Sequence, residues 1–304
     1  MRVRTAIARL LTLLLLLAPV LAAGDADAQA RCSVQIRDLG RIEPQDDYDP
    51  FASAPEPEYH RFEVAHLDGP SCQVAVTVSL GENGDRVMER SGGQLDYELF
   101  RDASLSTPLA DPDGSPSGWM VATIPEDESV DFAFFSVVPV GQIVPSGRYT
   151  DRVRFEVYLL EGGLPGRRLT NRQIQVRAEV LETVQTYVSI DGTPRPLTGG
   201  TLGTVDFGAL ETGANRAFQL TVQGNTDYSV TIESENEGRL GGGGGSIPYS
   251  LTIDGQSVGL GSGATLNYTN ARARTHALVV SVGDIGRTLA GTYTDNLYLT
   301  VTAR

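Results

Sequence analysis

The sequence predicts an all-β protein of two β-sandwich domains, the second of which lacks its final strand. Short runs of alternating apolar and polar residues predict strands with one buried face, because successive side chains along a strand point to opposite sides. Turn-forming residues are frequent between these runs: the 304 residues include 34 glycines and 16 prolines. From Arg31 onward no segment has a convincing helical period. Short strands separated by such turns favour β-sandwiches.

The first 30 residues have the features of a secretory signal. Arginines precede an apolar run at residues 10–23, which is too short to span a membrane comfortably. Ala28-Gln29-Ala30 has the small-x-small pattern of a cleavage site. We therefore expect residues 1–30 to be a signal peptide, with cleavage after Ala23 as the alternative, and we expect the mature chain to be exported.

The mature chain contains two cysteines, Cys32 and Cys72. Cysteines pair in the oxidising compartments that exported proteins reach. We expect a Cys32–Cys72 disulfide, the alternative being two free thiols.

The charge and the residue types exclude several classes of function. A net charge of −14 disfavours phosphate backbones, so we expect no nucleic-acid partner. The acidic residues at 46–49 and 111–113 do not have the spacing of a calcium loop, and the histidines have no ligand partners at metal spacing. No Gly-x-Ser-x-Gly motif is present. The sequence therefore predicts no metal, no cofactor and no catalytic residue.

The strands are arranged along the chain in two similar series. The alternating runs of the first series are residues 34–36, 74–78, 95–99, 130–138, 147–157 and 174–180. In the second half, residues 206–210 correspond to 38–42, 228–233 to 74–79, 247–254 to 95–102, and 291–301 to 147–157. Landmarks in the same order predict two related domains, residues 31–183 and 184–304. The run of glycines at 241–245 corresponds to a Gly-Gly of the first series, and we interpret it as a flexible natural hairpin loop.

The two series differ at their ends. Gly147-Arg-Tyr149-Thr-Asp151 opens a strand that is succeeded by a turn at 162–166 and a further strand at 174–180. Gly291-Thr-Tyr293-Thr-Asp295 opens a strand that runs to Arg304, with no further strand after it. We expect the first domain to close its own sheet and the second to expose an open edge. The wall of that edge is predicted to consist of Tyr293, Leu297, Leu299 and Val301.

The order of landmarks in the first series resembles the spore coat protein U domain family, the subunits of archaic chaperone–usher pili. The landmarks are Cys32, Asp38-Leu-Gly40, Cys72 before Val74-Ala-Val76, Arg86-Val-Met88, Leu95-Asp-Tyr97-Glu-Leu99, and Gly141-Gln142 with Pro145 before Gly147-Arg-Tyr149. The resemblance covers most of the first domain. The second domain is more divergent, because it lacks both cysteines and the Gly-Gln-x-x-Pro segment.

The resemblance implies immunoglobulin-like sandwiches and assembly by donor-strand complementation. A periplasmic chaperone would fill the open groove first. At the outer-membrane usher, the N-terminal extension of an adjacent pilin subunit would then replace it. The residues ahead of Cys32 are too short and too polar to serve as a donor strand, so we expect a position at the fibre tip. The expected location is a fimbria on the surface of a Gram-negative bacterium. The alternatives are an ordinary pilus-shaft or coat subunit and a periplasmic pilus chaperone.

A tip adhesin would contact an unknown surface or receptor through its loops. Trp119 and Met120, which come after a proline- and glycine-rich segment, and Tyr48 and Phe51 are the candidate adhesive residues. The alternative for Trp119 is that it begins a strand and packs inward. For Tyr48 and Phe51 the alternative is a solvated loop over the sandwich.

Overall fold

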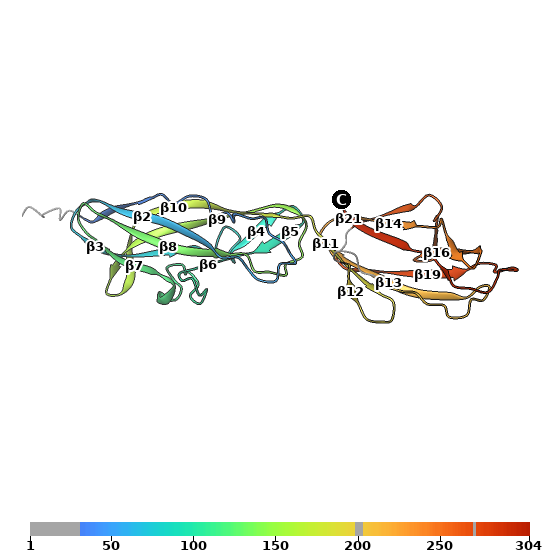
Figure 1. The fold of residues 1–304 in the computed structure, drawn as a ribbon. Helices are drawn as coiled ribbons and strands as arrows, with labels where there is room; N and C mark the ends of the chain where they lie inside the picture. The colour runs from blue at the N-terminus through green and yellow to red at the C-terminus, as the bar shows by residue number, and fades with distance from the viewer. Residues whose placement is uncertain (1–30, 198–202, 270–271) are drawn as a thin grey trace, which may run out of the picture.

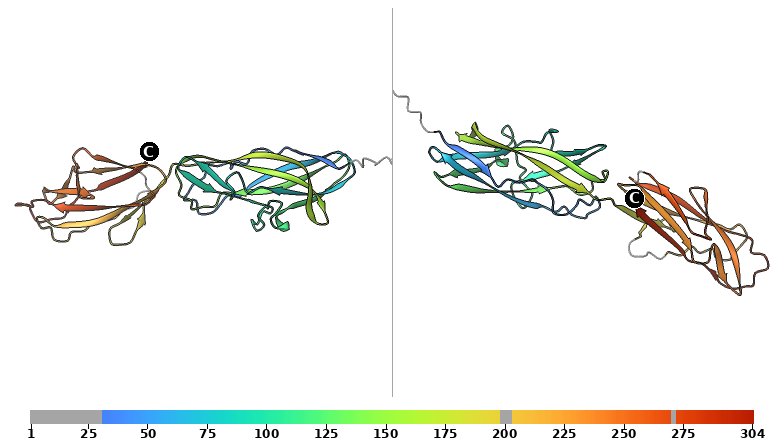
Figure 2. Two further views of the ribbon diagram at one scale, coloured as in Figure 1. Left: turned by 180° about the vertical axis from the view of Figure 1, so that it is seen from behind. Right: turned by 90° about the horizontal axis from the view of Figure 1, so that it is seen from above.

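The computed structural model describes residues 31–197, 203–269 and 272–304, which fold as two all-β units placed end to end (Figures 1 and 2). We call residues 31–183 the first domain and residues 184–304 the second domain. The described residues contain no α-helix, which confirms the predicted all-β class, and no helix among them could cross a membrane. The predicted signal peptide lies outside the described residues.

The first domain contains two facing sheets. One has the strand order β1 (Ser33–Arg37), β2 (Glu58–Asp68), β8 (Ser129–Val137), β6 (Glu98–Phe100). The other has the order β5 (Gly93–Asp96), β4 (Val87–Arg90), β9 (Gly147–Glu161), β3 (Cys72–Val78), β7 (Met120–Ile124), with β10 (Leu164–Val180) pairing with β9. β10 is antiparallel to β9 along its length, so it closes the edge of β9 that β3 leaves open.

The second domain has a similar arrangement of sheets, but among its described residues no strand corresponds to β10. Its larger sheet has the order β12 (Arg195–Pro196), β11 (Val184–Ser189), β13 (Asn215–Gly224), β19 (Arg274–Val282), β16 (Gly245–Ile253), β15 (Arg239–Gly242), β20 (Tyr293–Thr294), with β17 (Gln256–Val258) on β16. The smaller sheet has the order β18 (Ala264–Tyr268), β14 (Tyr228–Ser234), β21 (Leu297–Ala303). β14 lies between β18 and β21, as β3 lies between β7 and β9.

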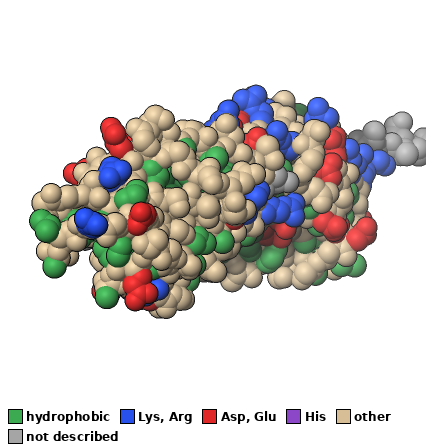
Figure 3. Space-filling view, turned by 90° about the vertical axis from the view of Figure 1, so that its right-hand side faces the viewer, with side chains coloured by type: hydrophobic (Ala, Val, Ile, Leu, Met, Phe, Trp, Pro, Cys, Tyr) green, Lys and Arg blue, Asp and Glu red, His purple; other side chains and the backbone are tan. Residues whose placement is uncertain are grey.

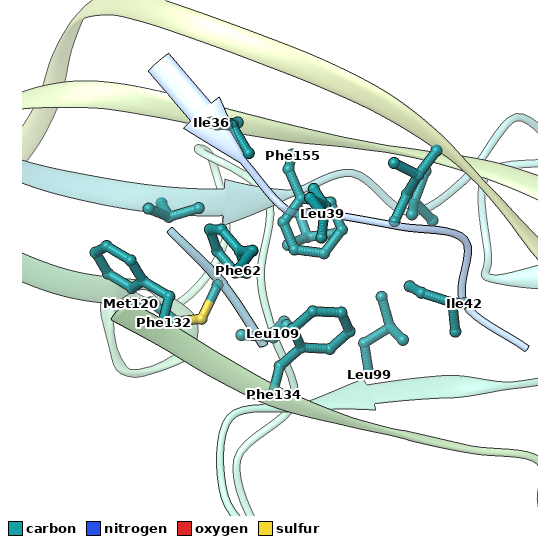
Figure 4. Close-up of a cluster of buried hydrophobic side chains, with 14 of the residues drawn as sticks. Ile36, Leu39, Ile42, Phe62, Leu99, Leu109, Met120, Phe132, Phe134 and Phe155 are labelled. Carbon is teal, nitrogen blue, oxygen red and sulfur yellow. The ribbon is translucent and has the colours of Figure 1, made fainter. Parts of the chain in front are cut away.

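Each domain has its own hydrophobic core. In the first, Phe62, Phe134 and Phe155 from β2, β8 and β9 point into the space between the sheets (Figure 4). The ring centre of Phe155 lies 5.5 Å from that of Phe62 and 5.2 Å from that of Phe134. The core of the second domain is built around residues such as Leu220, Ile232 and Leu251. No described residue belongs to both cores.

The predicted strand at 95–99 is divided at Tyr97. The chain leaves β5 at Asp96 and enters β6 of the opposite sheet at Glu98. Between them, the Tyr97 amide donates to the carbonyl of Arg86, and its hydroxyl donates to Asp151 over 2.6 Å. Alternation predicts the inward side chains here, but it does not reveal that the strand changes sheets.

The predicted disulfide joins Cys32 and Cys72, with 6.1 Å between their Cα atoms. Both cysteines are buried, one just before β1 and the other at the start of β3. Replacing both by serine is expected to lower the free energy of unfolding of the first domain by about 2–5 kcal/mol, because the unfolded chain loses its cross-link. Chemical denaturation with and without reductant measures this. A first domain unaffected by reduction would contradict it.

The glycine run forms the predicted hairpin, and most of it lies in paired strands. Gly241 and Gly242 lie in β15, Gly245 opens β16, and the turn between them packs against the strand that precedes β21. Gly242 has φ +152°, and a Cβ there would lie 1.9 Å from the carbonyl oxygen of Thr292. Close backbone approach therefore requires glycine.

Gly242→Ala is expected to destabilise the second domain by about 2 kcal/mol or more, because the backbone of Thr292 would have to move. Gly259→Ala is the matched control, since a Cβ there meets no atom within 4 Å. Thermal unfolding of both variants measures the difference. Equal stability of the two would refute the steric account.

Candidate functional site

The strand pairs β3–β9 and β14–β21 have the same register. Val76 lies opposite Val157 and Val78 opposite Phe155 in the first domain. In the second domain, Val230 lies opposite Val301 and Ile232 opposite Leu299. The position of each side chain in β21 can therefore be compared with its counterpart in β9.

The comparison shows that β21 has an open edge. Among the described residues, β21 pairs with β14 and with no other strand, whereas β9 pairs with both β3 and β10. Val153, Phe155 and Val157 are completely buried. Their counterparts Leu297, Leu299 and Val301 are only partly buried, although they pack on the core of the second domain. We call the surface along these three residues the β21 edge.

Two further positions are less covered in the second domain than in the first. Leu39 and Ile42 are buried in the first domain, whereas their sequence counterparts Phe207 and Leu210 are partly exposed. Cα atoms of β11 and β21 come within 8 Å of each other. A strand lying between β11 and β21 would need two strand spacings of about 4.8 Å each, which is more than this distance. β11 and β21 would therefore have to move slightly apart to admit one.

Tyr293 does not lie in β21. It belongs to β20, which pairs with β15, and its hydroxyl donates to the carbonyl of Leu289 over 2.6 Å. The structure thus brings together three of the predicted wall residues, Leu297, Leu299 and Val301. Tyr293 lies outside β21, before its first residue.

An aspartate fixes the start of the last strand in both domains. Asp295 accepts hydrogen bonds from the Tyr249 hydroxyl and from the Asn236 amide, over 2.5 and 2.9 Å. Asp151 makes the equivalent bonds with the Tyr97 hydroxyl and with a backbone amide. Burial, and after it the bond to the aspartate, raises the pKa of Tyr97 and Tyr249. The two aspartates have a structural role, as their equivalent positions in the repeat predict.

The candidate adhesive residues are mostly buried, so Trp119, Met120 and Tyr48 are not available for surface contact. Trp119 is 2 % exposed and its indole N–H donates to the carbonyl of Asp111 over 2.9 Å. Met120 begins β7 and points into the core. Tyr48 is 8 % exposed, and its hydroxyl donates to the carbonyl of Pro139. Phe51 remains partly exposed.

A polar relay in the second domain runs from the buried Tyr228 through His276 to Asp254 at the surface. The imidazole of His276, completely buried, lies 2.6 Å from the Tyr228 hydroxyl and 2.7 Å from the Asp254 carboxylate. Burial raises the pKa of Tyr228 to about 12. The relay links β14 of one sheet to β19 of the other, which is a structural role.

The described residues contain no group of three or more His, Cys, Asp or Glu side chains that could hold a metal ion. Seen from the end of the second domain, basic and acidic side chains are interspersed (Figure 3). That face does not present the continuous basic surface that phosphate backbones require.

Comparison with known proteins identifies the first domain. The Spore Coat Protein U domain matches residues 20–156. No curated protein sequence matches the chain. Several solved structures have a similar fold. One is a chain of the CsuC–CsuE chaperone–tip adhesion subunit pre-assembly complex from archaic chaperone–usher Csu pili of Acinetobacter baumannii. It has 14% identity and a TM-score of 0.48, and the match covers 88% of this chain and 99% of that one.

A second similar structure is the CupB6 tip adhesin from Pseudomonas aeruginosa, with 8% identity and a TM-score of 0.39. The match covers 90% of this chain and 95% of that one. A third is a mutant form of the CFA/I adhesin CfaE of enterotoxigenic E. coli, with 12% identity and a TM-score of 0.37, covering 89% of this chain and 81% of that one. The family match confirms the resemblance seen in the sequence: the Spore Coat Protein U domain model matches residues 20–156, in the first half of the chain.

Proposed function

We propose that this protein is an adhesive subunit of a chaperone–usher pilus whose second domain accepts a donor strand. The observation that carries the proposal is the β21 edge. The Spore Coat Protein U domain of the first half supports the coarser statement that the chain is a pilus subunit. The open edge supports an acceptor role, because unpaired backbone groups beside partly buried apolar side chains are a template for an added strand.

The first domain supplies the pattern for the missing strand. β10 pairs with β9 and directs Ile174, Val176, Ala178 and Val180 into the core, each 7 % exposed or less. Full burial of a valine or isoleucine side chain contributes about 1.5–3 kcal/mol. A donor with alternating apolar residues would gain similar contacts along the β21 edge, together with main-chain hydrogen bonds.

The direction of β21 supports a position of the first domain at the free end of the fibre. β21 ends beside the linker between the domains, where the carbonyl of Arg304 accepts a hydrogen bond from the Thr226 hydroxyl (Figure 1). A donor antiparallel to β21, as β10 is to β9, would run from the linker towards the far end of the second domain. The subunit that supplies it would then lie at that far end, leaving the first domain at the fibre tip.

This function requires three kinds of partner. A periplasmic chaperone would cover the β21 edge before assembly, an outer-membrane usher would secrete the subunit, and an adjacent pilin would donate the strand. The first domain would contact the surface or receptor, and the assembled protein would lie in a fimbria at the cell surface.

Peptide complementation of the full chain tests the acceptor role. A peptide copying residues 172–180, taken from β10, is added while the unfolding of each domain is monitored separately by NMR. We expect it to raise the melting temperature of the second domain and leave that of the first unchanged. The control is the same peptide with aspartate in place of the residues copied from Ile174, Val176 and Val180. A second domain that ignores both peptides and unfolds as stably as the first would overturn the proposal.

A further inference from the structure

Asn83 and Gly84 form an Asn-Gly pair in the exposed loop between β3 and β4. Such a pair is reactive, because glycine has no side chain to hinder attack by its amide nitrogen on the side chain of the asparagine. The sequence contains no other Asn-Gly pair. Asn83 is therefore the asparagine of this chain that its neighbour hinders least.

Both reacting groups are accessible in the structure. Asn83 and Gly84 are exposed, and a Cβ at Gly84 would meet no atom within 4 Å. Among the described residues, no protein group accepts a hydrogen bond from the Gly84 amide. The side chain of Asn83 is held by one exposed bond, in which its Nδ2 donates to the carbonyl of Val87 over 2.9 Å. Attack by the glycine amide therefore breaks a single exposed hydrogen bond of the protein.

Asn236 in the second domain provides a contrast. It is also exposed, and its Nδ2 also donates to a carbonyl, that of Thr294 over 3.5 Å. The next residue, Glu237, carries a side chain, and its amide donates to the carbonyl of Ser234 over 3.4 Å. Exposure is thus common to both asparagines, and the free glycine amide distinguishes Asn83.

We propose that Asn83 is a site of spontaneous deamidation. The amide nitrogen of Gly84 loses its proton and attacks Cγ of Asn83, a C–N bond forms, and the side-chain nitrogen leaves as ammonia. Water then opens the cyclic imide at either carbonyl, giving aspartate or isoaspartate. The reaction consumes water and releases ammonia, so it requires no oxidant or reductant. Asparagine is counted among the thermolabile residues.

The loop that contains Asn83 is attached to the last two strands of the first domain. The amide of Glu82 donates to the carboxylate of Asp151 over 3.0 Å. The carboxylate of Glu82 accepts hydrogen bonds from Arg152 of β9 and Gln173 of β10, over 3.4 and 3.1 Å. Glu82 therefore anchors one side of the loop.

The other side of the loop is anchored by Arg86. Its buried guanidinium donates to the carbonyls of Leu99 and Leu109, over 3.3 and 2.6 Å. Isoaspartate inserts one additional carbon atom into the main chain between these two anchors, and either product adds a negative charge next to Glu82. We expect the hydrogen bonds of Glu82 to weaken, so that deamidation loosens the attachment of the loop to β9 and β10.

Ageing of the full purified chain tests the proposal. The protein is incubated at physiological temperature and neutral pH, digested, and followed by peptide mass spectrometry. The peptide that contains Asn83 should gain about 1 Da, as NH₂ is replaced by OH, at least about tenfold faster than the peptide that contains Asn236. The rate should rise in mildly alkaline buffer, because the attacking amide must lose its proton. Labelling by an isoaspartyl methyltransferase identifies the isoaspartate.

Thermal unfolding of the aged chain, with each domain monitored separately by NMR, measures the loosening. The melting temperature of the first domain should fall by about 2 °C or more, and that of the second should not change. Asn83→Gln is the control, because its longer side chain cyclises far more slowly, and it should keep its mass and its melting temperature on ageing. Fresh Asn83→Asp should be less affected than the aged parent, since it adds the charge without the additional carbon.

Two outcomes would overturn the proposal. One is conversion of Asn83 no faster than that of Asn236. The other is full conversion with an unchanged melting temperature of the first domain. Neither measurement depends on strand acceptance by the second domain, so this proposal and the proposed function fail separately.

Discussion

Val176→Asp is expected to remove much of the stability of the first domain. Val176 is 2 % exposed in β10 and lies directly opposite Asp151, which is itself buried. The substitution would place a second carboxylate beside the first, away from water. An uncompensated buried charge costs about 3–5 kcal/mol, and like charges opposite each other add to this. Since a domain is stable by about 5–15 kcal/mol, much of the stability of the first domain would be lost.

The control for this substitution is on the same strand. Gln173 is exposed, lies opposite Arg154 and donates a hydrogen bond to Glu82 over 3.1 Å. Gln173→Asp exchanges that exposed bond for a contact with Arg154, so it should change the free energy of unfolding by less than about 1 kcal/mol. Domain-resolved denaturation measures both variants, and the second domain serves as an internal reference. A first domain that tolerates Val176→Asp would show that β10 is not its closing strand.

Phe155→Ala and Leu299→Ala are expected to have very different effects, although the two positions are equivalent. Phe155 is completely buried and contacts two other rings, so its truncation should cost about 3–5 kcal/mol. Leu299 is partly exposed at the β21 edge, and its truncation in the isolated chain should cost about 1 kcal/mol. Urea denaturation of each domain gives both values.

The difference in destabilisation between Phe155→Ala and Leu299→Ala should disappear when a donor strand is bound. With the β10-derived peptide present, Leu299→Ala should lower both the peptide affinity and the stability of the second domain. Thr300→Ala, an exposed neighbour on the opposite face, should change neither. If Leu299→Ala costs as much as Phe155→Ala without any peptide, the β21 edge is already covered.

The repeat could be predicted from the sequence because its signals are local. Alternation gives the inward residues of β3, β9, β14 and β21, and the Gly-x-Tyr-Thr-Asp motif aligns β9 with the segment that leads into β21. Alternation also marks Leu297, Leu299 and Val301 as inward-facing, but it does not show that they are only partly buried. The disulfide could be expected from the number of cysteines and the export signal.

Other features depend on contacts that local patterns do not encode. Trp119 is buried because its indole reaches the carbonyl of Asp111 across a turn. Tyr48 is buried because its segment forms a parallel bridge with Val180, far along the chain. The loop at Arg101 meets the loop at Ser117 through a hydrogen bond from the Arg101 guanidinium to the Ser117 carbonyl.

Hydrogen–deuterium exchange along β21 tests the central claim most directly. In the free protein, about every second amide of residues 297–303 should exchange quickly, because only alternate groups bond to β14. Adding the β10-derived peptide should protect these amides, while exchange in β9 stays slow throughout. Slow exchange of all β21 amides in the free protein would show a closed edge and contradict the account of this protein as a strand acceptor.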